Sequence, residues 1–96
     1  MNNFDTAING AKPVVVDFFA EWCGPCKMMP PILKDLKNRV GDKATILKMD
    51  IDKNPDYARK YGVQAVPTLI IFKNGKIVWR NPGVTTAQEI IKHLEM

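Results

Sequence analysis

Apolar residues occur in runs separated by turn-forming residues, and their spacing predicts two buried strands joined by a long helix. Residues 14–20 form an apolar run interrupted by one acidic residue, and residues 44–51 form a second run. Runs of this length are typical of buried strands. Between them, apolar residues recur at helical spacing from Cys23 until Gly41, with Pro31 inside the pattern, which predicts a long helix with a kink. Strand, helix and strand in this order predict a parallel pair with a right-handed crossover.

The second half of the chain predicts a short helix followed by a β-hairpin. Asn54-Pro55 is typical of a capping residue followed by proline at the first helical position, and the helix closes at Gly62. Residues 68–72 and 77–79 are apolar and are separated by Asn74-Gly75. Both turn residues tolerate a positive φ, so the segment predicts a tight hairpin. The sheet is therefore expected to contain parallel and antiparallel neighbours.

Two further helices are predicted near the ends of the chain. Asn3 caps a short helix that runs to Asn9 and stops at Gly10, and the residues from Thr85 to Gln88 match a capping box that opens the last helix. The apolar stripe of that helix consists of Ala87, Ile90, Ile91 and Leu94. Together the elements predict an α/β fold with a mixed central sheet of about four strands flanked by about four helices, in a single domain over residues 1–96.

Composition and charge narrow the functional class. The chain is 46% hydrophobic and 25% charged, as in ordinary globular domains. No apolar run approaches the roughly 20 residues that span a membrane, and the first residues lack the basic and apolar regions of a signal peptide, so we expect a cytoplasmic protein without membrane association. The net charge of +4 comes from dispersed basic residues, with only Arg59 and Lys60 adjacent, so nucleic-acid binding is not expected.

The two cysteines of the chain, Cys23 and Cys26, predict a redox centre. Residues 22–27 connect the first strand to the long helix, which places Cys23 at a helix N-terminus among unpaired backbone N–H groups. Such a position favours the thiolate, and only the thiolate attacks a disulfide. A sulfur that is stabilised as an anion also leaves easily, so Cys23 is able to act as nucleophile and as leaving group in successive exchanges.

Two other uses of the cysteine pair remain open at this point. A structural disulfide would close a very short loop and contribute only about 2 kcal/mol to stability. A zinc ion or an iron–sulfur cluster needs four ligands, and the chain has only one histidine besides the two cysteines. This histidine, His93, lies near the C-terminus of the last predicted helix, where its partial positive charge is favourable and no ligand role is expected. No metal ligands are therefore predicted.

Asp17 is the second candidate catalytic residue, because it interrupts a strand of valine and phenylalanine. A carboxylate in such surroundings loses hydration, so its pKa is expected to be well above the usual value. The neighbouring strand offers Lys48, and a contact between Lys48 and Asp17 beneath the cysteines is predicted. A raised pKa suits an acid that exchanges protons with Cys26. The alternative is a carboxyl group that is satisfied by backbone donors and has no catalytic part.

Four separated motifs make the chain resemble the thioredoxin family from about Phe4 to its end. They are Trp22-Cys23-Gly24-Pro25-Cys26-Lys27, the preceding Asp17, Val66-Pro67-Thr68 and Lys73-Asn74-Gly75. The resemblance implies the thioredoxin fold, a cis peptide bond at Pro67 that faces the cysteines, and a helix kink at Pro31. The substrate surface that it implies consists of Trp22, Gly24, Pro25, Ile51, Val66, Pro67 and Gly83.

The resemblance also implies a protein-disulfide reductase of the bacterial type. Cys23 would attack the substrate disulfide, and Cys26, losing its proton toward Asp17, would resolve the mixed disulfide. No cofactor would be bound, because a flavin-containing thioredoxin reductase would supply reducing equivalents from NADPH. The expected partners are this reductase and disulfide-containing proteins, and the chain is expected to be a monomer.

Three other functions are left open. A disulfide oxidase or isomerase of the same fold usually has histidine between the cysteines, where this chain has Gly24-Pro25. A partner-binding module would use the groove with the cysteines incidental. A dimer bridged by zinc or by a cluster would use the cysteines as ligands.

The chain departs from the family pattern at three places. Only three residues precede the first helix where bacterial thioredoxins usually have a further strand, so we predict four strands and an unprotected edge at residues 44–50, which invites pairing with another chain. Phe19 replaces the first tryptophan of the usual W-A-E-W-C, and Asn81-Pro82 precedes Gly83, which predicts a stiffer and less apolar groove rim. Core positions are expected for Met28, Met29 and Trp79.

Overall fold

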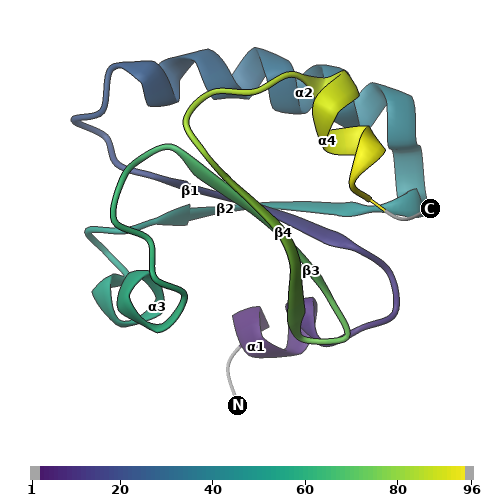
Figure 1. The fold of residues 1–96 in the computed structure, drawn as a ribbon, viewed down its shortest axis with the longest axis horizontal. Coiled ribbons are helices and arrows are strands. Elements are labelled where there is room, and N and C mark those ends of the chain that lie inside the picture. Colours follow the sequence, from purple (N-terminus) through teal and green to yellow (C-terminus); the bar gives the residue numbers. More distant parts are fainter. Residues whose placement is uncertain (1–2, 95–96) are drawn as a thin grey trace.

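The computed structural model describes residues 3–94, which form a four-stranded mixed sheet with helices on both faces (Figure 1). The elements in chain order are α1 (Asn3–Ile8), β1 (Val14–Phe19), the 3-10 helix η1 (Pro25–Met28), α2 (Met29–Val40), the 3-10 helix η2 (Gly41–Lys43), β2 (Thr45–Asp50), α3 (Pro55–Lys60), β3 (Thr68–Lys73), β4 (Lys76–Pro82) and α4 (Ala87–Lys92). The strand order is β2-β1-β3-β4, with β1 parallel to β2 and all other neighbours antiparallel. The predicted mixed sheet is confirmed, and within the described residues it has the expected four strands.

The sheet separates two apolar cores because successive side chains of a strand point to opposite faces. Val15 of β1 packs with residues of α2 and α4, while Val14 and Val16 pack on the side of α1 and α3. Figure 1 shows this arrangement, with α2 and α4 on one side of the sheet and α1 and α3 on the other. Both faces of β1 and β3 are therefore buried, which explains why their sequences are almost continuously apolar.

The long helix begins later than its apolar pattern predicts. Instead of one helix from Cys23, the chain forms η1 and then α2, and the change from 3-10 to α-helical geometry lies at Met28–Met29. The kink expected at Pro31 stays a prediction. Pro31 falls in the first turn of α2, where a missing N–H removes no helical hydrogen bond. Met29 is buried as predicted, but Met28 is 57% exposed, so its predicted core position is wrong. Gly41 ends α2 with a φ of 56°, as expected.

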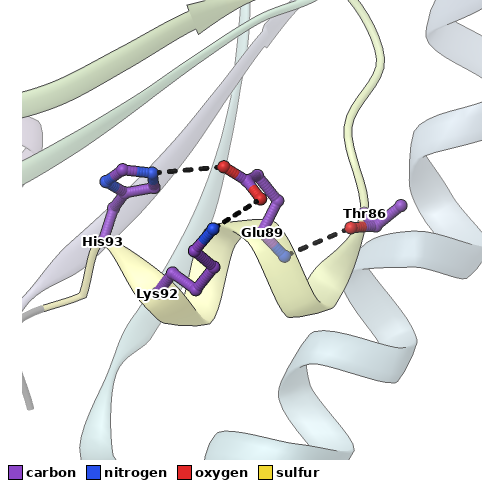
Figure 2. A network of polar contacts seen from close by, with 4 residues as sticks. All are labelled: Thr86, Glu89, Lys92 and His93. Atoms are coloured by element: carbon purple, nitrogen blue, oxygen red, sulfur yellow. Dashed lines mark hydrogen bonds and ion pairs between the residues drawn. The ribbon is translucent and has the colours of Figure 1, made fainter.

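The last helix begins one residue later than predicted. Thr86, and not Thr85, is the capping residue, and its Oγ1 accepts a hydrogen bond from the N–H of Glu89 at 3.1 Å (Figure 2). Glu89 also pairs with Lys92 at 3.5 Å and contacts Nε2 of His93 at 3.3 Å. Both Thr85 and Thr86 are followed three residues later by a residue that suits a capping box, so the sequence pattern does not distinguish them.

His93 lies at the C-cap of α4, where a polar residue was expected, and it also contacts the sheet. Its imidazole stacks on the indole of Trp79 with ring centroids 4.5 Å apart and planes 7° apart. Trp79 is partly buried and packs against the α2 and α4 core. The hydrogen bond from His93 is the main reason why the pKa of Glu89 is lowered. The stacked pair therefore anchors the end of α4 to β4.

The cap of α4 generates the first prediction. Replacing Thr86 by alanine leaves the N–H of Glu89 without its partner, so Thr86→Ala should lower the free energy of unfolding by about 1 kcal/mol. Thr85→Ala is the matched control and should change it by less than about 0.5 kcal/mol. Denaturant unfolding followed by circular dichroism measures both values. A larger loss in the Thr85 variant would contradict the assigned cap.

Candidate functional site

The two cysteines lie in the loop after β1 and form a disulfide with each other. Cys23 precedes η1, while Cys26 belongs to it, and their exposed fractions are 4% and 7%. The backbone N–H of Cys26 donates a hydrogen bond to Sγ of Cys23 at 3.1 Å. A donor aimed at this sulfur stabilises negative charge on it once the disulfide is reduced. The first turn of η1 thus provides the environment that the sequence predicted for a thiolate at Cys23.

A second wall of the site comes from the segments that flank β3 and β4. The peptide bond between Val66 and Pro67 is cis, as the resemblance implied, and the carbonyl oxygen of Val66 lies 3.5 Å from Sγ of Cys23. The N–H of Gly83 donates to the carbonyl oxygen of Pro67 at 2.7 Å. Gly83 has a φ of 93°, which a residue with a Cβ rarely adopts. The structure therefore brings Val66, Pro67 and Gly83 together beside Cys23.

The remaining predicted substrate residues surround the same cysteines. Ile51 is half-buried and packs against the small cluster formed by the cysteines and Ala20. Gly24 and Pro25 are exposed, and no atom lies within 4 Å of the position where a Cβ on Gly24 would be. Trp22 is 71% exposed, and its Nε1 donates to Oδ2 of Asp52 at 2.8 Å. An extended substrate would meet an open surface here.

Asp52 is the residue of this surface that the sequence analysis missed. Its carboxylate holds the indole of Trp22 in place from a turn that lies 30 positions further along the chain. This turn is itself ordered by Asp50, whose Oδ1 accepts the N–H groups of Asp52 and Lys53 at 2.9 and 3.3 Å. No motif connects Asp52 with Trp22, because their contact depends on where β2 ends in the fold.

Asp17 lies in the centre of the sheet, with an exposed fraction of 1%. Its Oδ1 is buried and has no hydrogen-bond partner, so the alternative of a carboxyl group satisfied by backbone donors is wrong for this oxygen. Burial raises the pKa of Asp17 to about 6, and the positive charge of Lys48 opposes this shift. The raised pKa that the sequence predicted is confirmed, together with its cause.

The predicted contact between Lys48 and Asp17 is only partly correct. The two residues are register partners on β2 and β1, but no ion pair between them is formed within residues 3–94. The ammonium group of Lys48 lies over the ring of Phe19 instead, 5.2 Å from its centroid. Lys48 is exposed, and a lysine on a sheet edge keeps its charge hydrated by extending its stem along an apolar neighbour. Lys48 therefore acts on Asp17 through its field and not through a direct bond.

A hollow of about 240 Å³ connects these groups. Asp17 and Cys26 both line it, and Phe19, Pro30 and Lys48 are among the other lining residues. The volume has room for water, which takes up roughly 30 Å³ per molecule in the liquid. The buried carboxyl group and the second cysteine thus share one solvent-sized space.

The described part of the chain gives no sign of a metal centre. No group of three or more His, Cys, Asp or Glu side chains within residues 3–94 is arranged to hold a metal ion. In the same range, no helix has the length and apolar character needed to cross a bilayer.

Comparisons with known proteins agree with this geometry. The thioredoxin family model matches residues 1–96. A thioredoxin from Alicyclobacillus acidocaldarius is 49% identical over 88 residues, covering 92% of this chain and 84% of that protein, and one from Staphylococcus epidermidis is 47% identical, covering 97% and 92%. Among solved structures, thioredoxin from Malassezia sympodialis superposes with a TM-score of 0.86 at 36% identity, covering 94% of this chain and 82% of that chain.

The buried carboxyl group generates a prediction about stability. A rise of the pKa from 3.8 to about 6 means that ionised Asp17 destabilises the folded state by about 3 kcal/mol. The unfolded chain ionises first as the pH rises, so this loss begins above pH 4, grows until about pH 6 and is then complete. Asp17→Asn should therefore gain stability relative to the unchanged protein across this interval, by about 3 kcal/mol.

Denaturant unfolding of the oxidised protein at pH 4, 5, 6 and 8 measures this difference. Asp42→Asn is the matched control, because Asp42 is exposed and its difference from the unchanged protein should vary by less than about 0.5 kcal/mol over the same pH values. A pH-independent difference for Asp17→Asn would contradict the assigned ionisation.

Proposed function

Since the chain belongs to the thioredoxin family and is a protein-disulfide oxidoreductase, we propose the following roles for its residues in the reduction of protein disulfides. The observation that supports these roles best is the hollow that Asp17 and Cys26 share, while Sγ of Cys23 lies beside the carbonyl oxygen of Val66. Disulfide-containing proteins are the substrates of this family, and the exchange needs no bound cofactor.

The first step is the attack of the Cys23 thiolate on one sulfur of the substrate disulfide. The substrate extends along the backbone of Val66, whose carbonyl oxygen lies 3.5 Å from Sγ of Cys23 and which precedes the cis bond to Pro67. A bond forms between Cys23 and the attacked sulfur, and the other substrate sulfur leaves as a thiolate that takes a proton from water. The N–H of Cys26 supports the anionic form of Cys23 before the attack.

The second step regenerates a free substrate and oxidises the protein. Cys26 gives its proton to the carboxylate of Asp17 through the hollow that both line, and its thiolate attacks Sγ of Cys23. The disulfide between Cys23 and Cys26 forms, and the second substrate sulfur leaves as a thiolate. Two electrons have then passed from the dithiol to the substrate. With a pKa of about 6, Asp17 is mostly ionised at neutral pH and accepts this proton.

The oxidised protein must then be reduced again. We assign this step to a flavin-containing thioredoxin reductase that draws on NADPH, so that the chain carries electrons between that enzyme and its substrates. The reductase and the substrate must use the same surface in each turnover, and a monomer leaves this surface free for both. We place this monomer in the cytoplasm.

The order of the two cysteines generates a prediction. In Cys26→Ser, the mixed disulfide between Cys23 and a substrate cannot be resolved, so covalent complexes should accumulate and be recovered from a lysate quenched with acid. Cys23→Ser is the matched control and should give few complexes, because it lacks the assigned nucleophile, whose sulfur lies 3.5 Å from the carbonyl oxygen of Val66. Equal yields from both variants would contradict the assigned order. Reduction of insulin disulfides with a thioredoxin reductase tests the overall activity, which both variants should lose.

The proton acceptor generates a separate prediction. Asp17→Asn should slow the resolution step at pH 7 by at least about tenfold, while the initial attack should change by less than about threefold. In the unchanged protein the resolution rate should rise with pH through about 6, where Asp17 ionises, and the variant should lack this rise. Rapid-quench measurements on a model mixed disulfide separate the two steps. Equal slowing of both would remove the assigned role.

A further inference from the structure

The outer edge of β2 presents unpaired backbone groups. The N–H groups of Thr45 and Ile51 donate to carbonyl oxygens of Pro13 and Phe19 on the side of β1, both at 2.9 Å. Because the direction of these groups alternates along a strand, the N–H and C=O groups of Ile46 and Lys48 point away from β1. No other strand of the described residues lies beyond β2. This edge is ready to pair with an extended chain.

The opposite edge of the sheet differs in a way that discourages such pairing. The β3–β4 ladder has a register shift between Ile71 and Phe72, and Pro82, which lacks an N–H, ends β4. Bulges and prolines are the devices that keep edge strands from pairing. The ladder between β1 and β2 runs without such a shift. Of the two edges, β2 is the one that is built to accept a strand.

Two hollows flank the β2 edge, one on each face of the sheet. On the α2 side, a hollow of about 510 Å³ has Leu33 and Ile46 in its lining together with Lys34 and Lys37 of α2. On the α1 side, a hollow of about 310 Å³ is lined mainly by apolar side chains, namely Phe4, Ala7, Leu47 and Met49. An added strand would direct alternate side chains into these two spaces.

The charges of the two hollows differ. Lys34, Lys37 and Lys48 all line the larger hollow, and no acidic side chain among residues 3–94 does. Lys37 already contacts Asp42 at 3.8 Å, and Lys48 lies over Phe19, but all three ammonium groups belong to exposed residues that can turn toward an incoming carboxylate. The smaller hollow has Lys48 as its only ionisable residue among the described ones. The larger hollow therefore suits acidic side chains and the smaller one apolar side chains.

We propose that the β2 edge docks an extended segment of a partner protein in which acidic residues alternate with apolar ones. The backbone of the segment pairs with Ile46 and Lys48, its acidic side chains enter the larger hollow, and its apolar side chains enter the smaller one. Backbone pairing supplies affinity, and the two hollows supply selectivity. The docking surface shares Pro30 and Lys48 with the hollow near Cys26 but includes neither cysteine, so docking does not depend on the proposed reductase mechanism.

A second copy of the chain fits this edge less well. Two β2 strands paired around a twofold axis would bring the lysines of both edges together, and each chain has a net charge of +4. Like charges placed opposite each other destabilise a strand pair. An acidic segment meets the same lysines with the opposite sign, which is why it is the occupant that the charges favour.

A synthetic peptide tests the proposal directly. The probe is an eight-residue peptide of alternating glutamate and valine, with both ends blocked, added to the oxidised protein at low ionic strength. Binding is followed by shifts of backbone amide signals in nuclear magnetic resonance and by hydrogen exchange. The amides of Ile46 and Lys48 should be protected at least about tenfold, while those of Trp22 and Gly83 remain unchanged. A peptide with lysine in place of glutamate should bind at least about tenfold more weakly.

Backbone pairing is tested with N-methylated peptides. Two peptides are made, one methylated on the odd-numbered and one on the even-numbered backbone nitrogens. Because successive N–H groups of a strand point to opposite edges, only one of the two peptides has lost the N–H groups that face β2. One of the two peptides should lose binding and the other should keep it. Retention of binding by both would show attraction by charge alone and would overturn the proposal.

Two double variants distinguish the effect of the lysines in the larger hollow on peptide binding from the effect of the net charge of the chain. Lys34→Glu with Lys37→Glu should weaken binding of the acidic peptide at least about tenfold. Lys12→Glu with Lys76→Glu makes the same change of net charge away from the hollow and should weaken it by less than about threefold. Insulin reduction should be unchanged in both, which keeps this test apart from that of the reductase mechanism. Equal weakening, amide shifts centred on Trp22 and Gly83, or dimerisation through β2 in sedimentation experiments would each overturn the proposal.

Discussion

The burial of a carboxyl group in the middle of an apolar sheet is the constraint on which the rest of the site depends. Asp17 has an oxygen without a hydrogen-bond partner, and its ionisation costs about 3 kcal/mol of stability. This cost is a sizeable share of the few kcal/mol that keep a domain of this size folded. The fold tolerates it because the surrounding strands bury both faces of the sheet. In return, a proton acceptor with a pKa of about 6 lies beside Cys26.

Most of the fold follows from local sequence signals. The apolar runs at β1 and β3, the Asn74-Gly75 turn and the glycine after α2 each specify one structure, and the structure has all of them. Boundaries were less predictable where two neighbouring residues satisfy the same rule, as at Thr85 and Thr86. The start of α2 was missed for another reason. The helical spacing of apolar residues continues through η1. Over so few residues, a 3-10 helix buries nearly the same positions as an α-helix, so the spacing does not distinguish the two.

The candidate site also contains residues that the sequence predicts and contacts that it does not. The cysteines, Asp17 and the segment around Pro67 could be named from the sequence because each lies within a motif. The position of the Lys48 ammonium could not, because it depends on the ring of Phe19, a residue at which this chain departs from the usual pattern. The contact between Asp52 and Trp22 was also beyond sequence reasoning, since it joins two loops through the fold alone. Motifs identified the reacting groups, and packing determined their surroundings.

Lys48 links the cysteine site to the edge of the sheet. Its positive charge lowers the pKa of Asp17, which opposes the effect of burial. Its backbone lies on the open edge of β2. It also lines two hollows, the one near Cys26 and the larger one on the α2 side. A carboxylate bound beside this lysine would offset its positive charge and remove the influence that keeps the pKa of Asp17 from rising further. Asp17 would then hold its proton to a higher pH and accept one from Cys26 less readily. A segment docked on β2 would therefore reach the redox chemistry through electrostatics, without touching the cysteines.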